Sequence, residues 1–348
     1  MTSSVRFDVR GPLGLITLSR PKALNALDLE MIRALRAQLD AWVEEPRVRA
    51  LVIQGEGGRA FCAGGDVRAV ATAPEDAPGE PLRRSFFREE YALNQRIHHC
   101  PKPFIALVDG VCMGGGLGVS MHGSHRVVGE RLVLAMPETA IGFFPDVGGG
   151  WFLPRFPGEA GTYLGLTGAR AGAADALWLG YATHHVPAEH FAALTQALAE
   201  ADWDAAAPRE VATRTLAAFH RDAGASALAA LAPAIDRLFA HPRVETILEA
   251  LAREPGEWAA QTHAALLRLC PTSLVVTLRL LREGRSRGYD ADVEVEYRLS
   301  QRLALRHDFR EGVRAVLVDK DGRPRWSPAT LAEVQAADVD ALFDARFA

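Results

Sequence analysis

The chain has 348 residues, of which 49% are apolar and 24% are charged, a composition typical of a folded protein with a sizeable core. Its formal net charge of −4 and its lack of basic stretches interleaved with aromatic residues argue against a nucleic-acid partner. No run of about eighteen apolar residues occurs, so we expect no membrane span and no membrane partner.

The cysteines and the first residues bear on the cellular compartment. The four cysteines show neither CxxC spacing nor the even framework of a short secreted chain, which argues against disulfides and structural zinc. The opening residues MTSSVRFDVR lack the apolar segment of a secretory signal. These observations predict a cytoplasmic protein.

Strands and helices alternate in the first part of the chain. Residues 5–10 and 13–19 flank a Gly-Pro turn and predict a two-stranded hairpin. Apolar residues recur every three or four positions after Asp28, which predicts an amphipathic helix with Asp28 as its N-cap. Further apolar runs predict strands at 50–54, 104–108, 126–128 and 132–135.

Helical patterns dominate the later part. A proline-rich acidic loop over residues 71–84 precedes a predicted helix at 86–98. Beyond residue 190 the chain is rich in Ala and Leu, and only residues 315–318 have the composition of a strand. We therefore expect an α/β catalytic core over residues 1–190 and a mainly helical C-terminal region over 191–348 that completes or covers the site.

Two glycine-rich turns, at residues 63–66 (AGGD) and 113–116 (MGGG), each follow a predicted buried strand. Glycine permits backbone conformations closed to other residues and leaves N–H groups accessible. Two such N–H groups aimed at one point form an oxyanion hole. Either turn alone would be an ordinary tight turn, but the pair, followed by acidic residues, favours an enzyme.

Residues 55–60 (GEGGRA) imitate a dinucleotide-binding fingerprint, with Glu75 and Asp76 about twenty residues later. A true fingerprint opens a helix at once, and the RAFCAGGD sequence that follows carries no helical pattern. The acids also fall in the proline-rich loop rather than at a strand end. We therefore reject a nicotinamide cofactor.

Two carboxylates stand in the otherwise apolar stretch MPETAIGFFPDVGGGWF, at Glu138 and Asp146. Acids beside Pro and Gly often serve only as caps or turn formers. In an apolar site they can instead act in catalysis. Because they follow the glycine turns, we predict catalytic roles. The nearby His122 and His125 have no third metal-ligand candidate, so no metal is expected.

Several motifs together resemble the crotonase, or enoyl-CoA hydratase/isomerase, superfamily: residues 20–27 (RPKALNAL), residues 60–66 (AFCAGGD), the MGGG turn and the segment around Glu138. The resemblance implies an α/β crotonase fold, a spiral of repeated ββα units. It also implies an acyl-CoA substrate whose carbonyl is bound by the N–H groups of Gly65 and Gly115. The coenzyme A part would contact Lys22, Ala23, Leu24, Ala63, Asp66 and Val67.

One departure from the superfamily pattern bears on the reaction. Hydratases carry two catalytic glutamates, and the position of the first is occupied here by Gly118, which has no side chain to move a proton. In place of that acid, this chain carries Asp146 where hydratases usually have glycine. The departure argues against ordinary hydration of a double bond.

Longer strings resemble the 3-hydroxyisobutyryl-CoA hydrolase family of valine breakdown: residues 86–91, 136–150, 270–274, 296–301 and 307–326. The resemblance implies hydrolysis of a short 3-hydroxyacyl-CoA thioester, with Glu138 as the attacking or activating carboxylate and Asp146 as its partner. Glu90 would accept a hydrogen bond from the 3-hydroxyl. No separate cofactor is implied, because coenzyme A is part of the substrate.

Other interpretations remain open. An enoyl-CoA isomerase or hydratase could use one carboxylate, and a noncatalytic acyl-CoA-binding protein could retain the glycine turns. Arginines at 298, 302, 306 and 310 are spaced as a solvated helix face or as contacts to coenzyme A phosphates. Members of the superfamily often form trimers, so a homo-oligomer is compatible with the resemblance, unless the C-terminal extension replaces the contact between subunits.

Overall fold

The computed structural model describes residues 4–74 and 81–346, which form two compact units made of interleaved segments. The first unit takes the described residues up to Gly65 together with Glu89–Leu134 and Ala171–Ala229. The second takes the described residues of 66–88, 135–170 and 230–348. The boundary expected at residue 190 stays a prediction. Glu75, Asp76 and much of the predicted loop at 71–84 lie outside the described residues.

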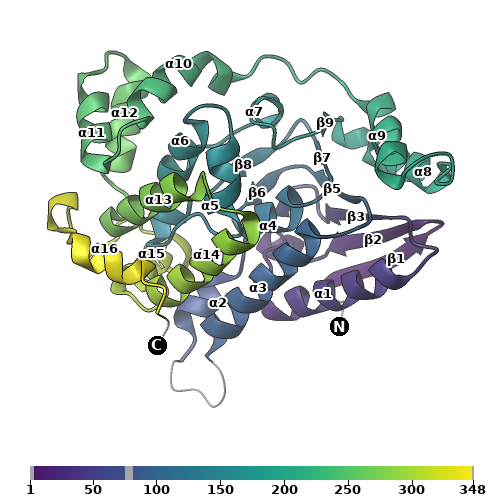
Figure 1. Ribbon diagram of the computed structural model, residues 1–348, viewed down its shortest axis with the longest axis horizontal. Coiled ribbons are helices and arrows are strands. Elements are labelled where there is room, and N and C mark those ends of the chain that lie inside the picture. Colours follow the sequence, from purple (N-terminus) through teal and green to yellow (C-terminus); the bar gives the residue numbers. More distant parts are fainter. Residues whose placement is uncertain (1–3, 75–80, 347–348) are drawn as a thin grey trace. The chain divides into compact units, whose positions relative to one another are not determined.

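The first unit contains a six-stranded sheet in the order β1-β2-β3-β5-β7-β9 (Figure 1). Its strands are β1 (Val5–Arg10), β2 (Leu13–Leu18), β3 (Ala50–Gly55), β5 (Phe104–Val108), β7 (His125–Val128) and β9 (His184–His185). The hairpin β1–β2 is antiparallel, and the later pairs are parallel. The predicted hairpin and the strands at 50–54, 104–108 and 126–128 are confirmed.

A second, three-stranded sheet has the order β4-β6-β8. Its strands are β4 (Ala60–Cys62), β6 (Val111–Met113) and β8 (Val133–Ala135). Along the chain, β3, β5 and β7 of the large sheet are each followed by a strand of the small sheet, and α2 or α4 follows β4 or β6. This alternation is the repeated ββα arrangement expected for the crotonase fold.

Helices surround these strands in the first unit. They are α1 (Leu29–Glu44), the greater part of α3 (Leu82–His98), α4 (Gly115–Met121), α7 (Ala173–Trp178), α8 (Phe191–Glu200) and α9 (Pro208–Phe219). The predicted N-cap of α1 is confirmed, because the Asp28 carboxylate accepts the Met31 N–H at 2.9 Å. The apolar face of α1 is buried, and the helix lies along β1 (Figure 1). Helix α3 begins four residues earlier than predicted.

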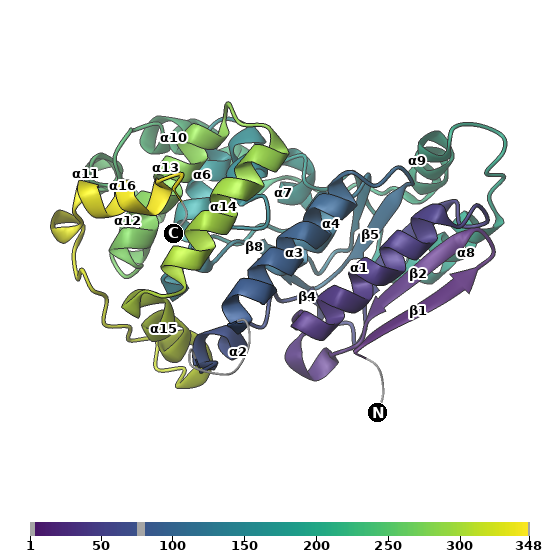
Figure 2. The same cartoon turned by 60° about the horizontal axis from the view of Figure 1, so that its bottom comes forward.

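The second unit is built mainly from helices. They are α2 (Val67–Thr72), α5 (Gly149–Phe152), α6 (Ala160–Thr167), most of α10 (Ala227–Phe239), α11 (Val244–Arg253), α12 (Glu257–Leu266), α13 (Pro271–Gly284), α14 (Tyr289–Leu303), α15 (His307–Val313) and α16 (Ala336–Phe343). Helix α16 packs against α14 (Figure 2). The predicted helical character beyond residue 190 is confirmed for the described residues.

The strand considered at 315–318 is wrong, because Arg314–Val318 form a π-helical turn that continues α15. The Asp319 N–H donates to the Arg314 carbonyl at 2.8 Å and closes this turn. The Arg314 guanidinium also binds Glu311, Asp319 and Asp321, on both sides of the turn. Apolar β-branched residues form a strand only where a neighbouring strand accepts their hydrogen bonds, and here the backbone bonds locally instead.

Within residues 4–74 and 81–346, no single helix is long and apolar enough to cross a membrane. The helices Glu257–Leu266 and Pro271–Gly284 meet the same criteria of length and composition only as a pair bent by 109°.

Candidate active site

The two glycine turns of the first unit lie side by side because the strands before them pair. Strands β4 and β6 run parallel with Cys62 opposite Cys112. Gly65 and Gly115 each lie three residues beyond these partners, so the paired strands deliver both turns to the same place. A Cβ atom added to Gly115 would lie 3.0 Å from the Gly65 nitrogen. The structure therefore places the two glycines close together, and the convergence of their N–H groups on one oxygen atom stays a prediction.

Both turns require glycine for physical reasons. Gly64 and Gly114 have φ angles of +116° and +47°, which L side chains rarely adopt. A Cβ atom on Gly116 would overlap the Cys62 carbonyl, so the two turns approach too closely for a side chain. Because the glycines have no side chains, the backbones of the two turns are in direct contact, and any larger residue would push the turns apart.

The amides of Gly65 and Gly115 are oriented by their neighbours. The Gly64 carbonyl accepts the Leu27 N–H at 2.8 Å. Because a peptide unit is planar and trans, the Gly65 N–H points away from Leu27. Gly115 is the first residue of α4, so its N–H has no carbonyl one turn earlier within the helix. Two N–H groups at adjacent positions can bind one oxygen atom.

Glu90 lies beside this pair of amides. Its side chain, on α3, is only 2% exposed. A Cβ atom added to Gly115 would overlap Glu90 Oε1, so the carboxylate borders the same point as the Gly65 nitrogen. Asn94, one turn further along α3, is also fully buried, and its amide atoms have no hydrogen-bond partner among the described residues. The structure therefore brings Gly65, Gly115 and Glu90 together within one unit.

The segment at residues 20–27 lies next to the first glycine turn. The Ala63 N–H donates to the Leu24 carbonyl at 3.0 Å. The buried Asn25 anchors the segment, because its amide nitrogen donates to the carbonyls of Glu56 and Ala60 at 2.9 Å each. Lys22 and Ala23, which precede this anchor, are exposed. Three predicted contacts to coenzyme A, at residues 22–24, thus lie close to a fourth, Ala63.

Asp66 and Val67, the other predicted coenzyme A contacts, begin a helix of the second unit. Asp66 is the N-cap of α2, and its carboxylate accepts the Ala69 N–H at 3.3 Å. Val67 is the first residue of that helix and is half-buried. Capping gives this carboxylate a structural role independent of any ligand.

Glu138 of the second unit opens a short 3-10 helix, η2 (Glu138–Ile141), and is 6% exposed. Its carbonyl accepts the Phe143 N–H at 3.1 Å, and Gly142 closes the turn with a φ of +70°. The Phe143 ring stacks on Phe87 with centroids 5.2 Å apart. Backbone bonds and aromatic packing therefore hold Glu138 in a buried, fixed position.

Asp146 is 6% exposed and begins a tight turn into α5. Its carbonyl accepts the Gly149 N–H at 2.8 Å. Val147, between them, has a φ of +54°, a conformation that costs about 1–3 kcal/mol for a residue other than glycine. The turn therefore depends on contacts outside itself, and Glu296 supplies them: its carboxylate accepts the Gly148 and Gly150 N–H groups at 2.7 and 2.9 Å.

Glu296 belongs to residues 296–301, one of the stretches that carry the family resemblance, but no role was predicted for it. A signal for it exists in the sequence. Asp292 and Glu296 lie four residues apart on the same apolar face of α14 as Val293 and Leu299, and all four are buried. Two acids on a buried helix face require partners, and this pattern indicates a structural or functional polar cluster.

Arg298 and Arg302, two of the four arginines spaced as a solvated helix face or as coenzyme A contacts, lie on α14. Arg302 donates to the carbonyls of Leu342 and Asp344 at 2.7 and 2.8 Å, and so holds the C-terminal end of α16. Arg298 is half-buried. The prediction of a solvated face is therefore wrong for Arg302, whose donors serve backbone carbonyls at a helix C-terminus.

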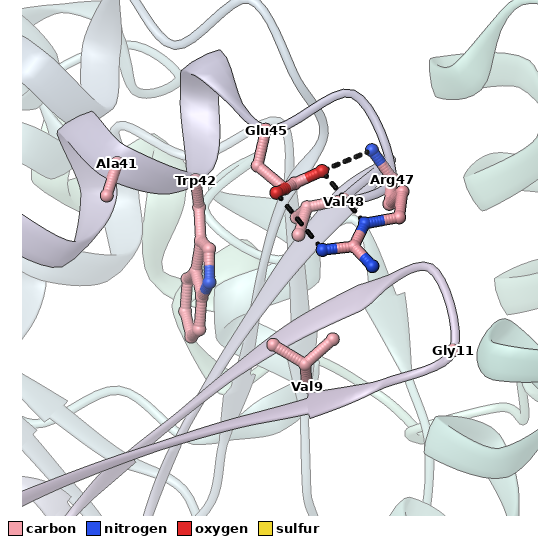
Figure 3. Close-up of a pocket in the computed structure, with 7 residues that line it drawn as sticks. All are labelled: Val9, Gly11, Ala41, Trp42, Glu45, Arg47 and Val48. Atoms are coloured by element: carbon pink, nitrogen blue, oxygen red, sulfur yellow. Dashed lines mark hydrogen bonds and ion pairs between the residues drawn. The ribbon is translucent and has the colours of Figure 1, made fainter.

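A cavity of about 460 Å³ lies elsewhere in the first unit, between the β1–β2 hairpin and the end of α1 (Figure 3). It is lined by Val9, Gly11, Ala41, Trp42, Glu45, Arg47 and Val48. None of the predicted site residues lines it, and its charged groups, Glu45 and Arg47, bind each other.

Among the residues that the structure describes, no group of three His, Cys, Asp or Glu side chains is arranged to hold a metal ion.

Comparison with known proteins assigns the family. The enoyl-CoA hydratase/isomerase family model matches residues 13–343. The chain is 45% identical to the mitochondrial 3-hydroxyisobutyryl-CoA hydrolase of Xenopus laevis, over 96% of this chain and 86% of that protein. It is 42% identical to the mitochondrial enzyme of Homo sapiens with the same name, over 97% of this chain and 88% of that protein.

A solved structure agrees with the fold. The carnitinyl-CoA dehydratase from Mycobacterium thermoresistibile matches with a TM-score of 0.90 and 38% identity, covering 99% of this chain and 97% of that one. The chain belongs to the enoyl-CoA hydratase/isomerase family, and within that family it is similar to the 3-hydroxyisobutyryl-CoA hydrolases.

The comparisons correct one prediction. The relatives from Xenopus laevis, Rattus norvegicus and Homo sapiens are named mitochondrial, which contradicts the expected cytoplasmic location and points to the mitochondrion. The expectation rested on the free cysteines and on the lack of a secretory signal in the opening residues. Free cysteines indicate a reducing environment and the second observation bears only on secretion, so neither distinguishes the cytoplasm from the mitochondrion.

Proposed function

We propose that this chain hydrolyses 3-hydroxyisobutyryl-CoA to 3-hydroxyisobutyrate and free coenzyme A, a step of valine breakdown. The observation that carries the proposal is the approach of the Gly115 position to the Gly65 nitrogen, beside the Glu90 carboxylate. The 45% identity to a hydrolase of this substrate over almost the whole chain supports the choice of reaction.

The reaction begins when the thioester carbonyl oxygen accepts hydrogen bonds from the N–H groups of Gly65 and Gly115. Negative charge develops on this oxygen as the carbonyl carbon becomes tetrahedral, and preorganised N–H donors stabilise that charge. Each such donor typically contributes about a hundred- to a thousandfold in rate. In this proposal the coenzyme A portion is bound by Lys22, Ala23, Leu24, Ala63, Asp66 and Val67.

Glu138 supplies the carboxylate that the hydrolysis needs. It either removes a proton from the attacking water or adds to the carbonyl carbon itself, giving an anhydride that water then hydrolyses. In both routes the bond between carbon and sulfur breaks, and the departing thiolate takes up a proton. Asp146 orients the attacking group or passes this proton to sulfur. The products are the hydroxy acid and the free thiol.

Hydration of an enoyl-CoA is the main alternative, and the similarity to a carnitinyl-CoA dehydratase favours it. The hydratase pattern of the superfamily needs a second acid at the position of Gly118. Here that residue is a buried glycine of α4 with no proton-transferring side chain. Hydrolysis fits the available acids better. An isomerase with one carboxylate or a noncatalytic acyl-CoA-binding protein would retain the same glycine turns.

A thiol-release assay across a small panel of substrates separates these functions. The wild-type protein is expected to release free thiol from 3-hydroxyisobutyryl-CoA, and more slowly from isobutyryl-CoA, which lacks the 3-hydroxyl. A change in absorbance with an enoyl-CoA and no thiol release would favour a hydratase or isomerase. Binding of acyl-CoA with no turnover of any panel member would favour a noncatalytic protein.

Glu90 is expected to set the preference for a 3-hydroxyl group. Replacing it with glutamine weakens the hydrogen bond that the hydroxyl donates to a carboxylate, so kcat/KM for 3-hydroxyisobutyryl-CoA should fall by about ten- to a hundredfold. The value for isobutyryl-CoA should change much less. Glu89→Gln on the same helix is the matched control, because Glu89 binds Arg33. Equal losses for both substrates would contradict this role.

A further inference from the structure

Glu296 joins two distant parts of the second unit. It lies on α14, 150 residues after Asp146, and is completely buried. Each of its carboxylate oxygens accepts one backbone N–H from the turn that follows Asp146: Oε2 from Gly148 and Oε1 from Gly150. A carboxylate bound by two N–H groups fixes the orientation of the peptide units that donate them.

The residues of the turn that Glu296 binds do not by themselves favour the backbone conformation that they adopt. Val147 is β-branched and 1% exposed, yet it adopts a φ of +54°, and the next residue, Gly148, has a φ of +89°. Two successive left-handed residues reverse the chain within a very short distance. Such a conformation persists when its surroundings determine it, and it commonly marks a functional site. The conformations of Val147 and Gly148 therefore determine the direction in which Asp146, immediately before them, points.

The surroundings of Glu296 make it costly to bury. Asp292 lies one turn earlier on α14, is also completely buried, and pairs with Arg287 at 3.2 Å. Burial, followed by the neighbouring charge of Asp292, raises the pKa of Glu296, whereas the Gly148 N–H bond lowers it. A leucine at this position would pack without that cost. The two N–H groups that it binds, together with a hydrogen bond between its side chain and that of Asp292, account for an acid at this position.

We propose that Glu296 is a positioning residue, which fixes the Asp146 side chain by holding the N–H groups of Gly148 and Gly150 and affects the reaction only through Asp146. This inference rests on the proposed function, in which Asp146 takes part in thioester hydrolysis. The Glu296 carboxylate itself contacts the backbone of the turn and forms no bond to the reacting atoms.

A double-mutant cycle tests this role. Glu296→Gln puts an NH₂ group where an acceptor is needed, so one of the two N–H bonds is lost. In the wild-type background kcat for thiol release should fall by roughly ten- to a hundredfold, while KM changes by less than about threefold. In an Asp146→Asn background the same substitution should change kcat by less than about threefold, because the group that it positions is already inactive.

A control and a second variant keep the cycle interpretable. Glu294→Gln, an exposed acid two residues away on α14, should leave kcat and the melting temperature unchanged. If Glu296→Gln does not fold, Glu296→Asp repeats the cycle, since its shorter side chain keeps the charge but reaches the turn less well. Circular dichroism identifies the folded variants.

The possible results separate the two claims. Loss of kcat in the wild-type background alone supports the positioning role. Equal loss in both backgrounds, or no loss in either, overturns the positioning role and leaves the proposed function in place. An Asp146→Asn enzyme as fast as the wild type overturns the catalytic role of Asp146, and the positioning role with it.

Discussion

Replacement of Glu138 by glutamine is expected to lower kcat for thiol release by about a hundredfold or more. The amide has nearly the same shape as the carboxylate but can neither accept a proton from water nor attack the thioester carbonyl. KM should change little, because substrate binding depends on other groups. Steady-state kinetics with 3-hydroxyisobutyryl-CoA, measured by capture of the free thiol, gives both values.

The Glu138 side chain is buried, so its variant needs a test of folding. Backbone bonds of η2 hold this turn, and they are unaffected by the change from carboxylate to amide. The melting temperature should therefore stay near that of the wild type, and Glu294→Gln serves as the control for an added amide. A folded Glu138→Gln enzyme with full turnover would remove Glu138 from the mechanism.

Gly115→Ala is expected to lower kcat by about a hundred- to a thousandfold, the effect of losing one oxyanion donor. The added methyl group would overlap Glu90 Oε1 and lie 3.0 Å from the Gly65 nitrogen. Either the carboxylate or one of the two turns must move, and both belong to the proposed site. The measurement is the kcat for 3-hydroxyisobutyryl-CoA at saturating concentration.

Gly172→Ala provides the matched control for this substitution. A Cβ atom on Gly172 would meet no atom within 4 Å, and this glycine has a φ of −93°, which alanine adopts readily. The control should retain wild-type turnover. If Gly115→Ala folds and also retains it, the group that the added methyl displaces, either the Glu90 carboxylate or one of the glycine turns, does not contribute to turnover.

The first part of the fold follows closely from sequence patterns. Asp28 before an apolar helical pattern predicted the start of α1, and the apolar run at 104–108 predicted β5, because capping and burial are local requirements. Residues 314–318 show the limit of this reasoning. Their apolar, β-branched composition suits a strand, but Arg314 and its acidic partners close a helical turn there.

The sequence indicates that the two glycine turns act together. What brings them side by side is the hydrogen bonding between the strands that precede them. Nothing in residues 63–66 or 113–116 alone specifies that they meet. They meet because Cys62 lies opposite Cys112 in parallel strands and both turns have the same length. Register between strands is a long-range property, which periodicity along the chain predicts only indirectly.

Glu296 shows what local reasoning misses. Its partners, Gly148 and Gly150, precede it by about 150 residues, so no spacing rule connects them. The strain at Val147 is equally invisible in the sequence, since valine usually favours extended backbone. A buried acid on an apolar helix face was the available signal, and it indicates that a partner exists without saying which.

The central claim is that the Gly65 and Gly115 N–H groups polarise the thioester carbonyl. The most direct test is the infrared stretching frequency of a ¹³C-labelled carbonyl in 3-hydroxyisobutyryl-CoA bound to the folded Glu138→Gln enzyme. We expect a shift to lower wavenumber relative to the thioester in water, and loss of most of that shift when Gly115→Ala is added. A bound carbonyl with the same frequency as in water would contradict the claim.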